Sequence, residues 1–331
     1  MDNYIIDLIY NNLTNKNDKI SLLTLCKSSR EMFYDRYNVK ISKITKNGDI
    51  SNGVKCLIIR HMNNDEINNL PTNLLSLTLG NHINTKIDNL PDSLQYLKLG
   101  DNFNQNVDNL PKNLEYLKFG YYFNQKVNNL PQKLQKLIFG NKFNQKVDNL
   151  PKSLQYLKFG LKFNQKVDNL PASVQTLIFG DNFYRKVNNL PASVQTLIFG
   201  DEFNQNVDNL PASVQYLKFG HYFNQKVDNL PQKLQTLKFY DYFDQKVDNL
   251  PQNLQILKLG NVFKQKIDNL PDSIQILKLG YKFNQKINNL PKSLSSIKIR
   301  KNYRYMQELK NLCGSDVKII LFQYHFPSGY I

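Results

Sequence analysis

The stretch Leu90–Asn109 reads LPDSLQYLKLGDNFNQNVDN. Twenty residues later it returns as LPKNLEYLKFGYYFNQKVNN, and the pattern continues in the same register as far as Leu290. Twelve of the thirteen prolines occupy one position of this repeat, from Pro71 to Pro291. Self-similarity at a fixed period near twenty residues indicates a stack of repeats in which each unit contacts only its neighbours.

The apolar residues within one repeat predict a single short strand. Leu97 and Leu99 are spaced at period two, so both should point inward, while Tyr96 and Lys98 should point outward. Proline cannot donate to a strand ladder, so the Leu-Pro segment is not expected to be a central strand. We therefore predict a leucine-rich-repeat-like solenoid of 20-residue rungs, with one parallel β-sheet face.

Three further columns of the repeat have predicted structural roles. Phe103 and Val107 should add to the core. Gly100 follows the strand, where a residue without a Cβ can adopt a turn conformation at little cost. Asn109 recurs in every unit, and its amide should hydrogen-bond backbone groups at a corner of the rung.

The two ends of the chain depart from the repeat. Residues 1–45 predict three short helices, residues 51–300 the repeat array, and residues 301–331 an α/β cap for the last rung. The apolar positions of the first two helical segments are Ile6, Leu8, Ile9, Leu13, Leu22 and Leu25. So small a module cannot bury a strong core alone, so we expect it to pack on the first rung or on a partner.

The N-terminal runs IIDLIYNNL and SLLTLCKSSREMF resemble the F-box, a module that docks onto the Skp1-type adaptor of a cullin ubiquitin ligase. The run lacks the Leu-Pro that opens many F-boxes and their late tryptophan. The resemblance implies that the six apolar residues above dock the adaptor. The alternative is a helical cap that only shields the first rung.

The repeat L-P-x-x-L-x-x-L-x-L resembles the short leucine-rich repeats of bacterial effector proteins. The whole unit, with FNQKVDNLP at 163–171, more closely resembles the FNIP repeat, which is known from social amoebae and giant viruses of amoebae, often behind an F-box. This resemblance implies a substrate-recognition adaptor for ubiquitination.

Composition favours a protein of the cytoplasm. The formal net charge is +16, which suits anionic partners and also solubility. Three widely spaced cysteines, without a CxxC pair, predict neither a disulfide framework nor a metal site. No secretory leader or apolar run long enough to cross a membrane is apparent.

The sequence predicts a binding protein rather than an enzyme, without a cofactor. It contains no Gly-rich phosphate loop and no clustered histidines. The outward columns vary from rung to rung and form the predicted partner-binding face: Tyr96, Lys98, Tyr116, Lys118, Tyr156, Lys158, Ile178, Ile198, Tyr216 and Lys218.

We expect this face to bind an unknown target protein while the N-terminal module binds a Skp1-like adaptor. Two alternatives remain: a basic nucleic-acid-binding solenoid, in which lysines contact phosphates and tyrosines stack on bases, and a plain scaffold whose N-terminal helices only cap the array.

Overall fold

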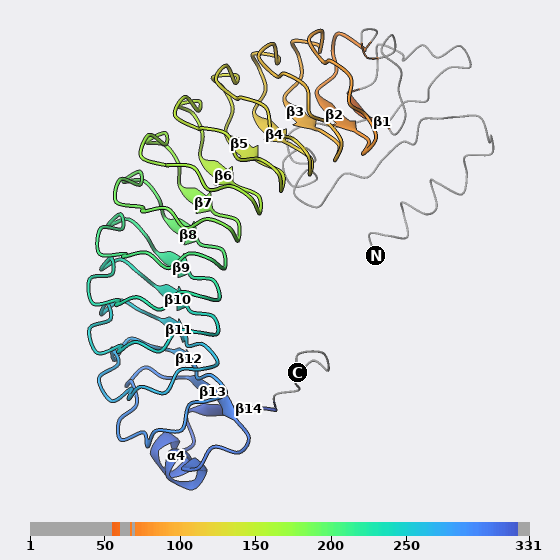
Figure 1. The fold of residues 1–331 in the computed structure, drawn as a ribbon. Helices are drawn as coiled ribbons and strands as arrows, with labels where there is room; N and C mark the ends of the chain where they lie inside the picture. The colour runs from red at the N-terminus through yellow and green to blue at the C-terminus, as the bar shows by residue number, and fades with distance from the viewer. Residues whose placement is uncertain (1–54, 60–66, 68–69, 324–331) are drawn as a thin grey trace, which may run out of the picture. The chain divides into compact units, whose positions relative to one another are not determined.

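The computed structural model describes residues 55–59, 67 and 70–323 (Figure 1). The chain divides into two compact units, Met1–Gly160 and Leu161–Ile331, and the described residues of each form a parallel β-solenoid of 20-residue rungs. The predicted N-terminal helices, with their six adaptor-docking residues, lie outside the described residues.

In the first unit, each described rung contributes one short strand. The strands are β1 (Cys56–Ile59), β2 (Ser76–Leu79), β3 (Tyr96–Lys98), β4 (Tyr116–Lys118), β5 (Lys136–Ile138) and β6 (Tyr156–Lys158). Each pairs in parallel with the next, with partners twenty residues apart, as in Leu97↔Leu117. The degenerate first strand keeps this register, since Leu57 pairs with Leu77.

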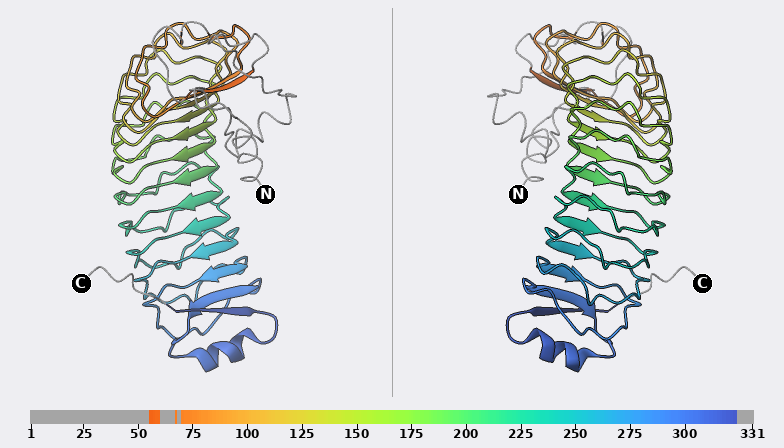
Figure 2. Two further views of the ribbon diagram at one scale, coloured as in Figure 1. Left: turned by 90° about the vertical axis from the view of Figure 1, so that its right-hand side faces the viewer. Right: turned by 90° about the vertical axis from the view of Figure 1, so that its left-hand side faces the viewer.

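The second unit continues the same construction to its C-terminal end. Its strands, the green to blue arrows of Figure 2, are β7 (Thr176–Ile178), β8 (Thr196–Ile198), β9 (Tyr216–Lys218), β10 (Thr236–Lys238), β11 (Ile256–Lys258), β12 (Ile276–Lys278), β13 (Ser296–Arg300) and β14 (Lys318–Phe322). Helix α4 (Met306–Cys313) lies between the last two strands in sequence, and β14 pairs in parallel with β13.

The core consists of residue columns that run through successive rungs. Leu94, Leu97 and Phe103 are completely buried, and Val107 is 2% exposed. Phenylalanines of two columns stack on one another within and between rungs. The ring centroids of Phe119 and Phe123 lie 3.7 Å apart. Shared burial of this kind links each rung to its neighbours, which is why a lone rung is not a folding unit.

The Leu-Pro segment forms a turn rather than a strand, as the proline predicts. The carbonyl of Pro91 accepts a hydrogen bond from the backbone N–H of Leu94 at 3.0 Å, and the same bond recurs in other rungs. Further turns occur at residues 101–102 and 108–109 of this rung. The strand is therefore the segment of each rung that forms the β-ladder along the stack.

The glycine column has a different role from the one predicted. Among the described glycines, only Gly314 has a positive φ, so Gly100 and its equivalents do not adopt a left-handed turn. A Cβ on Gly220 would instead overlap the backbone carbonyl of Gly200 in the preceding rung. Glycine is favoured here because it lets successive backbones approach closely.

The asparagine column also differs from the prediction. Asn109 is exposed, and its side-chain amide donates to the Asp88 carboxylate of the preceding rung at 3.2 Å rather than to the backbone. The backbone-satisfying role belongs to the Asn of the FNQ segment. The side-chain oxygen of Asn104 accepts the backbone N–H of Asn124 at 2.9 Å and the Gln125 amide at 3.1 Å.

The C-terminal elements cover the last rung, as predicted, but some of their apolar side chains remain exposed. Leu309 of α4 is 1% exposed, but Leu312 and Ile320 are 41% and 36% exposed. The helix ends at Gly314, whose φ of 58° is a conformation that favours glycine. A single helical face, that of Leu309 and Cys313, therefore makes the buried contact.

Candidate binding surface on the strands

The outward strand positions are less uniform than their period-two spacing predicts. Lys98, Lys118 and Lys218 are partly exposed and Lys158 is exposed. Ile178 and Ile198 are partly exposed and pair across β7 and β8. These residues keep the solvent-facing orientation that was predicted for them.

Two of the predicted tyrosines are not available on the surface. Tyr96 and Tyr116 are only 3% and 4% exposed. Their rings stack at a centroid distance of 4.2 Å, and the partly buried Leu75 and Ile138 pack against the pair. Because flat rings on neighbouring strands bury each other and recruit apolar neighbours, the prediction that they belong to an open binding face is wrong.

The other tyrosines of this column remain partly exposed but contact lysines. Burial raises the pKa of Tyr156, and Lys136 Nζ lies 4.7 Å from the centroid of its ring. In the second unit, Lys238 Nζ donates a hydrogen bond of 2.9 Å to the Tyr216 hydroxyl. Tyrosine and lysine thus form contacts with each other across rungs.

In the second unit, lysines of successive strands lie in register and form a row. Lys218, Lys238, Lys258, Lys278 and Lys298 occupy the last or central position of strands β9 to β13, and each pairs with the next. We call these five residues the lysine row. The pKa of Lys278 is lowered, first by burial and then by the positive charges of Lys298 and Lys258. The row therefore holds positive charges that repel one another.

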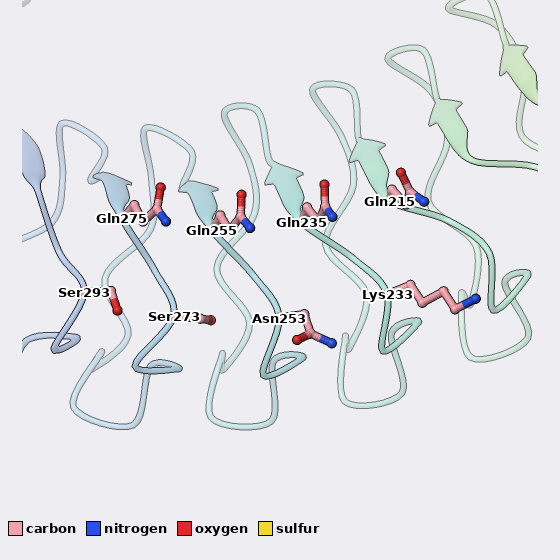
Figure 3. A pocket seen from close by; sticks show the side chains of 8 residues that line it. All are labelled: Gln215, Lys233, Gln235, Asn253, Gln255, Ser273, Gln275 and Ser293. Atoms are coloured by element: carbon pink, nitrogen blue, oxygen red, sulfur yellow. The ribbon is translucent and has the colours of Figure 1, made fainter.

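A groove of about 360 Å³ lies beside the starts of the same strands (Figure 3). Four glutamines, one per rung, line one side, and residues from the preceding turn line the other: Gln215, Gln235, Gln255 and Gln275, with Lys233, Asn253, Ser273 and Ser293. We call it the glutamine groove. The sequence analysis missed it, although the nearly unbroken glutamine column from Gln95 to Gln275 was a visible signal.

Backbone hydrogen bonds hold the groove glutamines in line. The Gln215 carbonyl accepts the N–H groups of Gln235 at 2.8 Å and Thr236 at 3.0 Å, and the next rungs repeat this pattern. The carboxamides then project side by side from the strand starts (Figure 3). A row of neutral donors and acceptors at the starts of the strands that carry the lysine row can bind an extended, anionic and hydrogen-bonding ligand.

The described residues do not contain a group of three or more His, Cys, Asp or Glu side chains that could hold a metal ion. In the same part of the chain, α4 and every other helical segment fall short of the length and apolar character needed to cross a bilayer. The chemistry of this surface is that of charge, hydrogen bonding and aromatic contact.

Comparison with known proteins identifies the repeat. The family model FNIP Repeat matches nine stretches of the chain, of which the first eight overlap in succession: residues 83–109, 106–142, 123–162, 143–182, 163–202, 185–222, 203–242, 223–261 and 265–302. A search of curated proteins found no match.

Solved structures share the fold. The crystal structure of CroV588, described as a novel circular LRR protein structure, matches with a TM-score of 0.74 at 37% sequence identity, over 85% of this chain and 48% of that one. YopM from Yersinia enterocolitica WA-314 matches with a TM-score of 0.53 at 20% identity, over 77% of this chain and 59% of that one, which is a likeness of fold alone.

This chain spans about half the length of CroV588. The repeat matches extend over most of the described residues and coincide with the rungs from β3 to β13. Because the FNIP Repeat model matches more than half of the chain and the matched repeats form the rungs of the solenoid, the chain belongs to the FNIP repeat family.

Proposed function

We propose that this protein is a non-enzymatic protein–protein interaction protein whose lysine row and glutamine groove bind an acidic segment of a target protein. Leucine-rich-repeat-like solenoids suit protein–protein interaction, because their sheet presents a long and regular surface. The observation that carries the proposal is the in-register lysine row, in which burial and then the positive charges of Lys298 and Lys258 lower the pKa of Lys278. An acidic partner would relieve the repulsion between these charges.

The test is the binding of a fluorescein-labelled, glutamate-rich peptide measured by fluorescence anisotropy. The double variant Lys258→Glu, Lys278→Glu should weaken binding by about tenfold or more, because each reversal replaces an attraction with a repulsion. The matched control is Lys266→Glu, Lys286→Glu, which makes the same charge change at exposed positions of the rungs that hold β11 and β12, outside the strands. Equal weakening by both variants would contradict a specific binding face.

We further propose that residues 1–45 connect the array to a cullin ubiquitin ligase. The support is the F-box-like run of Ile6, Leu8, Ile9, Leu13, Leu22 and Leu25 ahead of a binding solenoid. The test is a pull-down with a Skp1-type adaptor, in which a known F-box protein serves as the positive control. Recovery of the adaptor with the full chain but not with residues 46–331 supports this role, and failure with the full chain contradicts it.

Nucleic acid is the less favoured ligand of the lysine row. Bases bind single-strand-binding surfaces by stacking on exposed aromatic rings, but Tyr96 and Tyr116 are buried and Tyr216 is engaged by Lys238. This alternative would be favoured if labelled single-stranded RNA or DNA bound more tightly than the glutamate-rich peptide and if its affinity fell steeply with salt concentration.

A further inference from the structure

An acidic and aromatic island interrupts the basic surface of the second unit. In residues 201–204, 221–224 and 241–244, which follow the strands of three successive rungs, the chain has four carboxylates and no lysine or arginine. The equivalent corners of other rungs carry Lys142, Lys162 and Lys282. On a chain of formal net charge +16, four carboxylates without a lysine or arginine in three successive corners need a local explanation.

Glu202, Tyr222 and Tyr242 occupy the same position in these three rungs. Backbone hydrogen bonds hold the corners in register, from Tyr222 N–H to the Asp201 carbonyl at 3.0 Å and from Tyr242 N–H to the His221 carbonyl at 3.1 Å. The two rings are stacked at a centroid distance of 5.3 Å and are 50% and 52% exposed. Two parallel rings with open surface therefore stand next to an exposed carboxylate.

Elsewhere, the chain places its own cations over tyrosines near these corners. Lys142 lies 5.8 Å from the ring centroid of Tyr121, and the Arg185 guanidinium lies 5.3 Å from that of Tyr184. Within the described residues, no lysine or arginine lies over Tyr222 or Tyr242. Tyr121 and Tyr184 lie one and two residues away from the repeat position of Tyr222 and Tyr242, so cations do reach tyrosines of these corners, but the chain does not supply one to Tyr222 or Tyr242.

The remaining carboxylates of the island have partners within the protein. Asp241 lies 3.1 Å from His221 and accepts the Asn261 amide at 2.6 Å. Asp244 lies 3.5 Å from Lys264, and Asp201 accepts the backbone N–H of His221. Glu202 is not in an ion pair with any described residue, so it is the carboxylate that an incoming cation can reach.

We propose that Glu202, Tyr222 and Tyr242 form a docking site for an arginine-bearing segment of a partner protein. The guanidinium plane stacks on the tyrosine rings while its N–H groups pair with the Glu202 carboxylate, a combination that a lysine ammonium cannot match because it is neither planar nor a bidentate donor. This site is separate from the lysine row and has the opposite charge preference. It goes beyond the proposed function and does not depend on it.

The test uses two fluorescein-labelled peptides, one of Gly-Arg repeats and one of Gly-Lys repeats, titrated with the full chain in fluorescence anisotropy. The net charge of +16 repels both peptides, so binding of either requires a local acceptor. We expect the arginine peptide to bind more tightly than the lysine peptide. Glu202→Gln and the double variant Tyr222→Ala, Tyr242→Ala should each weaken arginine-peptide binding by about three- to tenfold.

The first unit offers a matched control in Tyr122, which is 51% exposed at the same position of its rung but is flanked by Asn102 and Lys142 instead of an acid. Tyr122→Ala should leave peptide binding unchanged. The double substitution Asn102→Glu, Lys142→Tyr transplants the arrangement into this unit and should add a second arginine-peptide site per chain.

Failure of wild-type chain to bind the arginine peptide would overturn the proposal. So would equal affinity for the two peptides, or equal weakening by Tyr122→Ala. The double variant Lys258→Glu, Lys278→Glu changes the lysine row and should not weaken arginine-peptide binding. The two proposals can therefore fail independently.

Discussion

Single residues in this protein are constrained chiefly by what lies twenty residues before and after them. Phe203 is completely buried and stacks with Phe183 and Phe223 at centroid distances of 6.1 and 6.2 Å. Tyr222, only one residue before Phe223, is half exposed and contacts a ring of the next rung on the outside. Neighbours in sequence can therefore differ greatly in their contribution to stability.

Truncation of a core ring should be far more costly than truncation of a corner ring. Phe203→Ala is expected to lower the free energy of unfolding by about 3–5 kcal/mol, because it removes buried surface and leaves a cavity in the stack. Tyr222→Ala should change it by less than about 1 kcal/mol. Denaturant unfolding followed by circular dichroism measures both, and similar losses would contradict the assignment of the two columns.

The close approach of rungs at the glycine column predicts a specific sensitivity. Gly220→Ala should destabilise the protein by about 1–3 kcal/mol, because the added Cβ overlaps the Gly200 carbonyl and forces the two backbones apart. Lys226→Ala, at an exposed position of the following corner, is the control and should stay within about 0.5 kcal/mol. A neutral Gly220→Ala variant would show that the rungs can separate freely there.

The last core tyrosine predicts a loss of stability at alkaline pH. Tyr303 is 3% exposed, its hydroxyl donates to the Gln285 carbonyl at 2.6 Å, and burial raises its pKa from 10.0 to about 12. Between these two values the unfolded chain loses the proton before the folded chain does, so stability should fall as pH rises through this window. Tyr303→Phe should lack this part of the decline, which thermal unfolding measured at several pH values can detect.

At the scale of the element, the unit of construction is the rung with its corner contacts. The Asn224 side-chain oxygen accepts the Asp244 backbone N–H at 2.9 Å and the Gln245 amide at 3.2 Å. Asp244 then does the same for the backbone N–H of Lys264 at 2.9 Å. An acceptor at this corner satisfies a donor of the following rung that no strand reaches.

This corner contact can be tested with a conservative rescue. Asn224→Ala should lower the free energy of unfolding by about 0.5–1.5 kcal/mol, since it removes the acceptor of a backbone hydrogen bond. Asn224→Asp should retain most of the stability, because Asp244 already fills this role one rung later. Equal losses in the two variants would show that the contact is not what stabilises the corner.

At the scale of the molecule, the strand edges of the stack must be covered. In the second unit, β14 pairs with β13, and Leu309 of α4 is buried beside them. Truncation after Arg300 should therefore expose the β13 edge and promote self-association as well as loss of stability. Size-exclusion chromatography with light scattering measures this. Truncation after Gln323, which retains β14, is the control and should leave the oligomeric state unchanged.

Much of the fold follows from the sequence because the twenty-residue period repeats one local solution. Leu97, Leu99 and Phe103 could be placed in the core from spacing alone, and Pro91 excluded a strand at its own position. The strand at Leu57 could be anticipated for the same reason, because it occupies the columns of its neighbours. A repeat makes such predictions reliable, since every column is sampled many times in a single chain.

The binding surface could be predicted only in part. Period-two spacing places Tyr96 and Lys98 on one side of the sheet, but it does not say that the Tyr96 ring stacks on Tyr116 and becomes buried. Likewise, a glutamine column becomes a groove only when the carboxamides of four rungs line up beside a second column (Figure 3).

The sequence by itself determined the solenoid, the length of its rungs, the core columns and the one strand in each repeat, because these depend on local spacing that recurs. Only the tertiary structure decided which outward side chains remain accessible, why glycine is favoured in its column, and which asparagine satisfies the backbone. Those outcomes depend on contacts between residues twenty positions apart, where the packing of one rung on the next determines what each side chain meets.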